Sequence, residues 1–177
     1  MKIISGGQTG ADLGGVIAAK LCGIETGGWM PKGFKNHDGL MPQFKEMFCL
    51  KEHSDVGYKS RTWKNIEDSD ITIRIACNFN SPGEKCTLNG IKHHKKPYID
   101  ILVDKNNPVI NSTKVIEVMH KIKNCEVVNI AGNARKTWDG MGYYTVEFMC
   151  SVFLMMGYNR TSLRHLIQLD NRYKEIL

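Results

Sequence analysis

The chain has 177 residues, of which 42% are hydrophobic and 24% are charged, and its net charge is +6. This length favours one domain and allows a core that needs no disulfide or metal ion. No apolar run reaches the roughly 20 residues that cross a membrane. The first residues also lack the apolar region and cleavage site of a secretory signal. We therefore expect a cytoplasmic protein that has no contact with a membrane.

The cysteine and histidine patterns predict neither disulfides nor a metal site. The six cysteines are spread along the chain with no CxxC pair, and Cys22, Cys77 and Cys150 lie among apolar residues. Such spacing favours reduced, mostly buried thiols over a disulfide framework or a zinc site. The six histidines show no HExxH or comparable ligand spacing.

The excess of positive charge gives little support for a nucleic-acid partner. Lysines are scattered, and the dense run KHHKK at residues 92–96 precedes Pro97, at the end of an expected helix. Cationic side chains at a helix C-terminus complement the helix dipole. We therefore expect a modest preference for anionic ligands and no binding to nucleic acid.

Short apolar runs alternate with longer amphipathic runs along the chain. Residues 2–5 form the first expected strand. Residues 11–21 form the first helix, with Leu13, Val16 and Ile17 on one face. In chain order the remaining expected elements are a strand just before Thr26, a short strand at 48–50, a helix at 61–68 opened by Ser60 or Thr62, a strand at 71–77, a helix at 87–94, a strand at 98–103, a helix at 112–123, a strand at 126–130 and helices at 143–156 and 161–177.

Strands that alternate with helices predict an α/β protein with a Rossmann-like parallel sheet and helices on both faces. We expect one domain over residues 1–158. An extra C-terminal helix then forms an appendage over residues 159–177. The apolar helix at 146–156 suggests a helical interface in a homo-oligomer.

The strongest local signal is SGGQTGAD at residues 5–12, where a strand runs through three glycines into a helix. Glycine lets a ligand approach the backbone closely, and the helix start offers unpaired N–H groups. The candidate contacts to a phosphate or carboxylate are Gly6, Gly7, Gln8, Thr9 and Gly10. Asp12 is a candidate acceptor from a ribose hydroxyl, or a partner of the helix dipole. The spacing matches neither GxGxxG nor a P-loop, and a tight turn without a ligand is the alternative.

Two more glycine-containing loops are expected at the same edge of the sheet, TGGWMPKG at 26–33 and SPGEKCT at 81–87. Their candidate ligand contacts are Trp29, Lys32, Gly33, Ser81, Gly83 and Thr87. Trp29 can stack on a base and Lys32 can supply a charge to a phosphate. A loop with a packed tryptophan is the alternative for the first of them.

Arg61 and Asn65 are candidate contacts from the expected third helix. A cation near a helix N-terminus opposes the helix dipole, and a locally unfavourable residue points to a functional reason. Asn65 lies four positions on, near the same face. A solvated basic helix start is the alternative. The sequence contains no GxSxG nucleophile motif, and we assign no catalytic residue.

Taken together, these motifs resemble the molybdenum-carrier family of the SLOG superfamily, which are Rossmann-like relatives of the lysine-decarboxylase-like LOG proteins. The matching stretches are IISGGQTGAD at 3–12, TGGWMPKG at 26–33, RTWKNIEDSDITI at 61–73, SPGEKCTL at 81–88, KKPY at 95–98 and VVNIAGN at 127–133. The resemblance implies an oligomeric, Rossmann-like binding domain. It also implies that the ligand is molybdenum cofactor, a phosphorylated pterin, or a nucleotide derivative. The family's ligand contacts fall on the candidates named above, except Trp29.

The chain departs from its relatives at two places. LOG-type phosphoribohydrolases carry PGGxGTxxE, which ends in a catalytic glutamate, whereas this chain has PGEKCTLNG at 82–90 with Gly90 in that position. This difference argues against an enzyme of that type. After Asn133 the family continues with an arginine and an acidic residue, whereas here Arg135 is displaced by one and Lys136 follows.

The leading hypothesis is a carrier, sensor or sequestering protein for a phosphorylated nucleotide-like or pterin-like molecule. The alternative is a hydrolase that cleaves an N-glycosidic or phosphoester bond in a nucleotide. Such an enzyme needs a carboxylate near the ligand, and Asp12, Asp38 and Glu84 are the candidates.

Overall fold

A computed structural model describes residues 1–161. The C-terminal helix expected at 161–177 lies outside the described residues, and so does almost all of the appendage expected at 159–177. Across the described part, no helix is long and apolar enough to cross a membrane.

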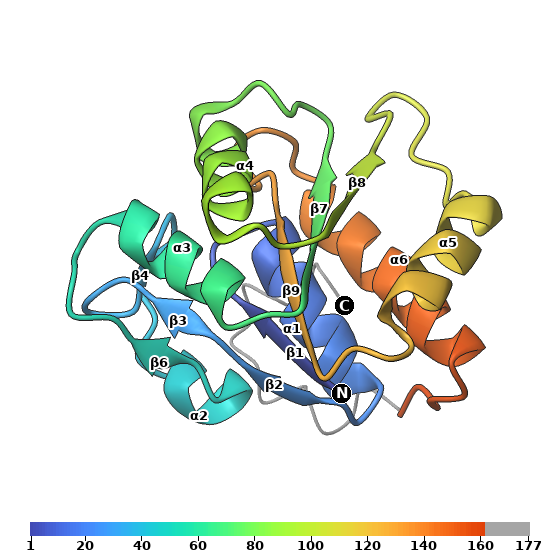
Figure 1. The fold of residues 1–177 in the computed structure, drawn as a ribbon, viewed down its shortest axis with the longest axis horizontal. Helices are drawn as coiled ribbons and strands as arrows, with labels where there is room; N and C mark the ends of the chain where they lie inside the picture. Colours follow the sequence, from blue (N-terminus) through green and yellow to red (C-terminus); the bar gives the residue numbers. More distant parts are fainter. Residues whose placement is uncertain (162–177) are drawn as a thin grey trace.

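A five-stranded sheet forms the centre of the molecule, with β1, β9 and β7 in the middle (Figure 1). All its neighbouring strands are parallel, in the order β2-β1-β9-β7-β8. The strands are β1 (Lys2–Ser5), β2 (Glu25–Gly27), β7 (Ile71–Ala76), β8 (Tyr98–Leu102) and β9 (Val127–Gly132). The Rossmann-like parallel sheet predicted from the sequence is therefore correct.

The two faces of this sheet differ in polarity because side chains alternate along each strand. On β7, Ile73 and Ile75 belong to the apolar core, whereas Thr72 and Arg74 point to the other face. The register pairs Ile73 with Ile130 and Thr72 with Asn129. One face is consequently apolar across the central strands, and the opposite face carries buried polar side chains.

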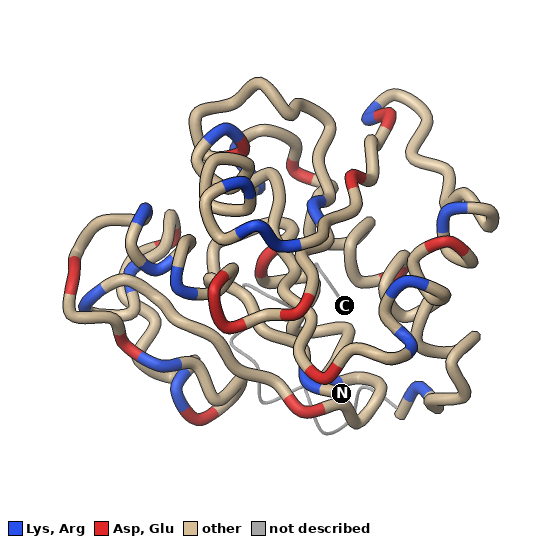
Figure 2. Tube along the Cα trace, in the orientation of Figure 1, with Lys and Arg blue, Asp and Glu red and all other residues tan. Residues whose placement is uncertain are grey.

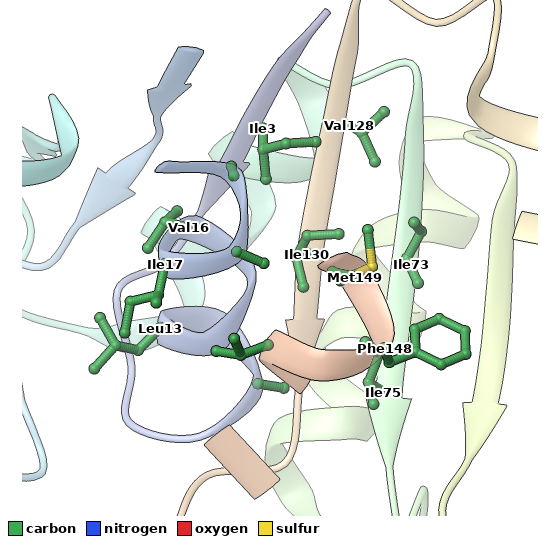
Figure 3. Packing of buried hydrophobic residues seen from close by; sticks show 14 of the residues in the cluster. Ile3, Leu13, Val16, Ile17, Ile73, Ile75, Val128, Ile130, Phe148 and Met149 are labelled. Atoms are coloured by element: carbon green, nitrogen blue, oxygen red, sulfur yellow. The ribbon is translucent and has the colours of Figure 1, made fainter. Parts of the chain in front are cut away.

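Three helices cover the apolar face, namely α1 (Ala11–Leu21), α5 (Ser112–Ile122) and α6 (Met141–Met155). Figure 3 shows Leu13 and Ile17 of α1, Phe148 of α6 and Ile130 of β9 among the side chains of this core. At Gly14, a Cβ atom would lie 2.6 Å from the backbone oxygen of Gly142. The two helices can cross this closely only because a glycine is present there.

The helix α6 uses most of its apolar surface inside the molecule. Phe148, Met149, Val152 and Phe153 are buried in the core. Large apolar side chains that remain exposed on α6 are Tyr143, Leu154 and Met155. The oligomeric interface expected at this helix therefore stays a prediction.

The polar face is covered by α3 (Tyr58–Glu67) and α4 (Pro82–His94) (Figure 1). Both helices begin earlier than expected from the sequence. The helix expected from residue 61 begins at Tyr58 with Gly57 as its N-cap, so neither Ser60 nor Thr62 caps it. The helix expected from residue 87 begins at Pro82, because Ser81 caps it and proline suits the first helical position. The third loop is thus largely a helix N-terminus.

A small subdomain lies between β2 and α3, consisting of β3 (Trp29–Met30), β4 (Lys35–Asn36), β5 (Gly39–Leu40), α2 (Phe44–Phe48) and β6 (Lys51–Glu52). The short strand expected at 48–50 is wrong. Residue 48 ends α2, where the rings of Phe44 and Phe48 are buried and pack at 5.2 Å between centroids. An apolar pair at i and i+4 favours a helix over a strand. Extended structure resumes only at Lys51.

Charged residues of both signs are distributed along the trace, as Figure 2 shows.

All six cysteines lie within the described residues and are free thiols. Cys22 and Cys150 are buried as expected, whereas Cys77, Cys86 and Cys125 are half-buried and Cys49 is exposed. The expectation of mostly buried thiols is therefore met by two of the six.

Candidate ligand-binding cleft

A cleft of about 310 Å³ opens at the carboxyl ends of β1, β7 and β9. After β1 the chain crosses outward to β2 at one edge of the sheet, and after β7 it crosses outward to β8 at the other edge. The strand β9 lies between β1 and β7. Loops that leave central strands in different directions create a crevice of this kind in open α/β sheets. The lining residues are Gly6, Gln8, Asp12, His37, Tyr58, Arg61, Thr62, Asn65, Ser81, Pro82, Gly83, Glu84, Cys86, Thr87, Asn129, Ala131, Gly132, Asn133, Ala134, Lys136 and Thr137.

The structure brings most of the candidate residues to this cleft. The candidates that line it are Gly6, Gln8, Asp12, Arg61, Asn65, Ser81, Gly83 and Thr87. The candidates that lie outside its lining are Gly7, Thr9, Gly10, Trp29, Lys32 and Gly33. Contact of any of these residues with a ligand stays a prediction.

The second glycine segment is engaged within the protein. The indole Nε1 of Trp29 donates to Asp68 Oδ2 at 2.8 Å, and Lys51 Nζ lies 5.4 Å from the ring centroid. The amide of Gly33 donates to the carboxylate of Glu52. These contacts are consistent with the alternative interpretation, a loop with a packed tryptophan.

The first glycine loop also uses several of its N–H groups internally. The amide of Gly7 donates to Ser5 Oγ at 3.1 Å, and the amide of Thr9 donates to Gln8 Oε1 at 2.9 Å. Gly10, the N-cap of α1, has φ of +90°, which glycine adopts readily. Asp12 lies in the first turn of α1 and accepts from the amide of Gln8 at 3.4 Å. The protein's own carboxylate thus complements this helix N-terminus.

Arg61 and Asp12 form a buried ion pair at one end of the cleft. Arg61 Nη1 lies 2.9 Å from Asp12 Oδ2, and the two side chains are 9% and 6% exposed. Burial raises the pKa of the Asp12 carboxyl, and the Arg61 guanidinium opposes this rise. Arg61 Nε is buried with no hydrogen-bond partner among the described residues. The unfavourable position of Arg61 in the first turns of α3 is thus explained by a tertiary partner.

Asn65 holds α3 against β3. Its Oδ1 accepts from the amide of Trp29 at 2.9 Å, and its Nδ2 donates to the carbonyl of the same residue at 3.0 Å. Both functional ends of the side chain are therefore occupied by backbone groups, although the residue also lines the cleft.

The N-terminus of α4 opens onto the cleft. Ser81 Oγ accepts from the amide of Glu84 at 3.4 Å, and Pro82 has no N–H group. Within residues 1–161, the amide of Gly83 makes no hydrogen bond. Lys136, an exposed cation from the loop after β9, lines the same cleft. A helix N-terminus and a cation together favour an anionic group at this position.

Glu84 is the most deeply buried ionisable group in the lining, with 2% of its surface exposed. Its Oε1 accepts from Asn133 Nδ2 at 3.4 Å, whereas Oε2 has no hydrogen-bond partner among the described residues. The nearest cation, Arg74, places Nη1 3.8 Å from Oε2. Burial raises the pKa of Glu84 to about 7, with Arg74 opposing the rise.

A hairpin formed by β4 and β5 closes the side of the cleft next to the first loop. His37 at its tip lines the cleft, and its amide donates to Gln8 Oε1 at 2.9 Å. Burial, followed by the positive charge of Lys136, lowers the pKa of His37. Asp38 forms an ion pair with Arg135, which connects the hairpin to the loop after β9.

Several cleft residues were not among the candidates chosen from the sequence. These residues include His37, Tyr58, Asn129, Asn133 and Lys136. Glu84 is predicted from the sequence only as a catalytic carboxylate of the alternative enzyme, and it lines the same cleft. Asn129 could have been predicted from the sequence, because an asparagine inside an otherwise apolar strand requires a polar neighbour. It donates to Thr72 Oγ1 at 3.2 Å on the polar face of the sheet. His37 lies in the subdomain between β2 and α3, and Tyr58 begins α3 directly after it. Their position beside the cleft depends on how this subdomain folds, which the local sequence does not indicate.

All three carboxylates considered for catalysis lie next to a cation. Asp12 pairs with Arg61, Asp38 pairs with Arg135, and Glu84 Oε2 lies 3.8 Å from Arg74 Nη1. Asp38 Oδ2 and Glu84 Oε2 are both buried without a hydrogen-bond partner among the described residues. Gly90, which occupies the position of the LOG-type glutamate, packs against the neighbouring helix. A Cβ atom there would lie 2.8 Å from Ile66 Cδ1 and 2.9 Å from Trp63 Cδ1. Within residues 1–161, no three His, Cys, Asp or Glu side chains are grouped so that they could hold a metal ion.

The fold and the position of the cleft place the chain in the class of Rossmann-like α/β proteins. Specifically, the chain belongs to the circularly permutated YpsA SLOG family, whose sequence model matches residues 3–153. The crystal structure of a "Putative molybdenum carrier protein" from Syntrophus aciditrophicus SB is similar, with 34% identity and a TM-score of 0.73. The match covers 86% of this chain and 94% of that one. No curated protein matches the chain.

Proposed function

We propose that the protein binds a phosphorylated nucleotide-like or pterin-like molecule in this cleft, as a carrier, sensor or sequestering protein. The observation that carries the proposal is the opening of the α4 N-terminus onto a cleft that also contains Lys136 and Arg61. The cleft volume of about 310 Å³ is within the range of small-molecule sites.

The phosphate is assigned to the α4 end of the cleft. There the amide of Gly83 is available, the helix dipole favours negative charge, and Lys136 adds an exposed ammonium group. The α1 N-terminus is a weaker candidate, since Asp12 already occupies it. This assignment moves the anion from the first loop, which the sequence favoured, to the third.

The heterocycle is assigned to the part of the cleft between the hairpin and α3. His37 and Tyr58 line this part, with ring centroids 6.2 Å apart in an edge-to-face arrangement. Aromatic side chains provide flat apolar surface for a base or a pterin. The similar protein from Syntrophus aciditrophicus is named a "Putative molybdenum carrier protein", which supports a cargo that contains molybdenum. Molybdenum cofactor, a phosphorylated pterin, is the cargo of this kind that we propose.

Native mass spectrometry tests the proposal, followed by denaturation and identification of any released molecule. Titration calorimetry with nucleoside monophosphates and with a pterin phosphate gives the affinities. We expect Lys136→Ala to weaken binding about 10- to 100-fold, as expected for loss of one charge-assisted hydrogen bond. Lys121→Ala, which removes an exposed lysine from α5 on the other side of the sheet, is the matched control. Wild-type affinity in the Lys136 variant would contradict the assignment of the phosphate.

A nucleotide hydrolase is the second candidate, and Glu84 is the observation that favours it. A buried carboxyl whose pKa lies near neutrality can exchange a proton with a substrate. Turnover of a nucleotide by the wild type that Glu84→Gln abolishes, while ligand affinity is retained, would establish this candidate over simple binding.

A further inference from the structure

We infer that Asn129 and Arg61 form a recognition site for a sugar, in which hydroxyl groups of a ribose bind at the floor of the cleft. The preferred ligands are then ribonucleotides, and their deoxy counterparts are disfavoured. This inference rests on the proposed function, because it assumes that a phosphorylated heterocyclic compound occupies the cleft.

Asn129 is the first reason, because its side chain is almost completely buried and still has a free oxygen. The residue lies in β9 and lines the cleft, with only 2% of its surface exposed. Its Nδ2 donates to Thr72 Oγ1 at 3.2 Å, whereas its Oδ1 accepts no hydrogen bond from the described residues. Unlike Glu84 Oε2, this oxygen is not sealed from solvent, so a donor on a ligand can reach it from the cleft.

Arg61 supplies a free donor close to this oxygen. Its Nη1 forms the ion pair described above and its Nε is sealed, whereas Nη2 has no partner among the described residues and is open to the cleft. The guanidinium lies over the backbone of Gly6, which directly follows the last residue of β1. That last residue, Ser5, pairs with Ile130, the residue after Asn129. Gly6 is thus a diagonal neighbour of Asn129, at a separation that long side chains can span.

Neighbouring polar side chains that line the cleft are already used within the protein. Asn65 binds the backbone of β3 with both ends of its amide. Thr62 and Thr87 donate their hydroxyl groups to backbone carbonyls in their own helices, at 2.8 and 3.1 Å. Hydrogen bonding to a ligand at the floor therefore falls to Asn129 and Arg61.

A hydroxyl group suits this combination of a free donor and a free acceptor. It can accept a hydrogen bond from the guanidinium of Arg61 and donate one to Asn129 Oδ1, and two vicinal hydroxyl groups can divide these contacts between them. A phosphate or carbonyl oxygen can meet only the guanidinium, and an amino group can meet only the asparagine oxygen. The floor therefore favours a ligand with a diol.

The stereochemistry of a nucleotide turns its diol toward this floor. In a β-ribonucleotide the base and the 5′-phosphate arm leave one face of the ribose, and the 2′- and 3′-hydroxyl groups leave the opposite face. The phosphate is assigned above to the α4 end of the cleft, and the heterocycle to the part between the hairpin and α3. Asn129 lies deeper, because β9 continues beyond it to Gly132. A ribose that connects the two assigned positions consequently presents its hydroxyl groups to the floor.

Titration calorimetry compares the affinities of the wild type for ribonucleotides and for their deoxy forms. The probes are AMP, GMP, CMP and UMP, each with its 2′-deoxy and its 3′-deoxy form, and 6-hydroxymethylpterin phosphate. We expect any ribonucleotide that binds to be preferred about 10- to 100-fold over at least one of its two deoxy forms, as for the loss of a hydrogen bond to a charged or buried group.

Three variants separate recognition of the sugar from a structural role of Asn129. Asn129→Ala removes the acceptor, so the preference should fall about 10-fold while the affinity for the disfavoured deoxy form changes less than about threefold. A purely structural role would lower both affinities together. Asn129→Asp keeps an oxygen at this position and should keep the preference. Thr26→Val, the matched control, removes a buried hydroxyl from β2 outside the cleft lining and should leave both affinities unchanged.

The wild type alone can overturn the inference, without any variant that might fail to fold. Equal affinity for a bound ribonucleotide and for both of its deoxy forms does so, and so does a preference that Asn129→Ala retains in full. Binding of the pterin phosphate without any nucleotide also overturns the inference, while the proposed binding function stands. Failure of the wild type to bind any of these compounds overturns the proposed function, and this inference with it.

Discussion

The guanidinium of Arg61 lies directly over the backbone of Gly6, in the space that a side chain at that position would fill. A Cβ atom at Gly6 would be only 1.2 Å from Arg61 Nη1, the atom that pairs with Asp12. Gly6 therefore leaves room for the Arg61 side chain from α3. The local sequence predicted instead that this glycine lets a ligand approach the backbone.

The ion pair between Arg61 and Asp12 should contribute strongly to stability. Arg61→Met leaves a buried carboxylate without its partner, and we expect a loss of about 3–5 kcal/mol in the free energy of unfolding, measured with urea. Lys64→Met removes a cation from an exposed pair with Asp68 on the same helix and should cost at most about 1 kcal/mol. Equal effects of the two substitutions would contradict the buried pair.

Gly6→Ala should act through the same ion pair. The added methyl group displaces Arg61 from Asp12, so the alanine variant should lose a similar amount of stability. In the double variant with Arg61→Met, the two losses should be clearly less than additive, because both remove one interaction. A double-mutant cycle in urea measures this coupling, and strict additivity would show that the two residues act independently.

The stability of the protein should fall as the pH rises through neutrality. Burial raises the pKa of Glu84 from 4.5 to about 7, so the folded state binds more protons than the unfolded state in this interval. The stabilisation from protonated Glu84 is complete below about pH 4.5 and is lost as the pH rises through 7. It amounts to about 3 kcal/mol.

Glu84→Gln should remove this part of the pH dependence and should be more stable than the wild type at pH 8. Asp12, whose pKa is also raised by burial, contributes a slope of the same sign, whereas His37, whose pKa is lowered by burial, contributes a slope of the opposite sign. Unfolding in urea at pH 5, 6, 7 and 8 measures the effect. The control is Glu117→Gln, which changes a half-buried carboxylate of α5 outside the cleft. An unchanged slope in the Glu84 variant would rule out this residue as its source.

The start of α4 at Pro82 can be tested through its cap. Ser81→Ala removes the acceptor for the amide of Glu84 and should cost about 1 kcal/mol. Ser81→Asp should restore most of the loss, since aspartate caps helices equally well. Thr113→Ala, at an exposed position in α5, is the control. A cost in Ser81→Ala no greater than in the control would place the effective start of the helix elsewhere.

The sequence by itself determined the parallel α/β architecture and the edge of the sheet that carries the cleft. Hydrophobic periodicity over six residues or more is a strong local signal, so β7, α1 and α6 were predicted to within a few residues. The SGGQTGAD stretch predicted the first loop correctly, because three closely spaced glycines after an apolar run indicate a turn between a strand and a helix. The short α2 was missed because its two phenylalanines favour a helix only when both are buried on one side.

Only the tertiary structure decided how the polar residues of the cleft are used. Arg61 and Asp12 are 49 residues apart in the sequence, and nothing in either segment indicates that they neutralise each other. Glu84 and Asn133 are likewise 49 residues apart, and the orientation of the asparagine depends on two amides after β7. Burial, desolvation and hydrogen-bond partners are properties of residues brought together from different elements. Local sequence therefore indicates where a site lies, whereas packing determines which atoms in it remain available.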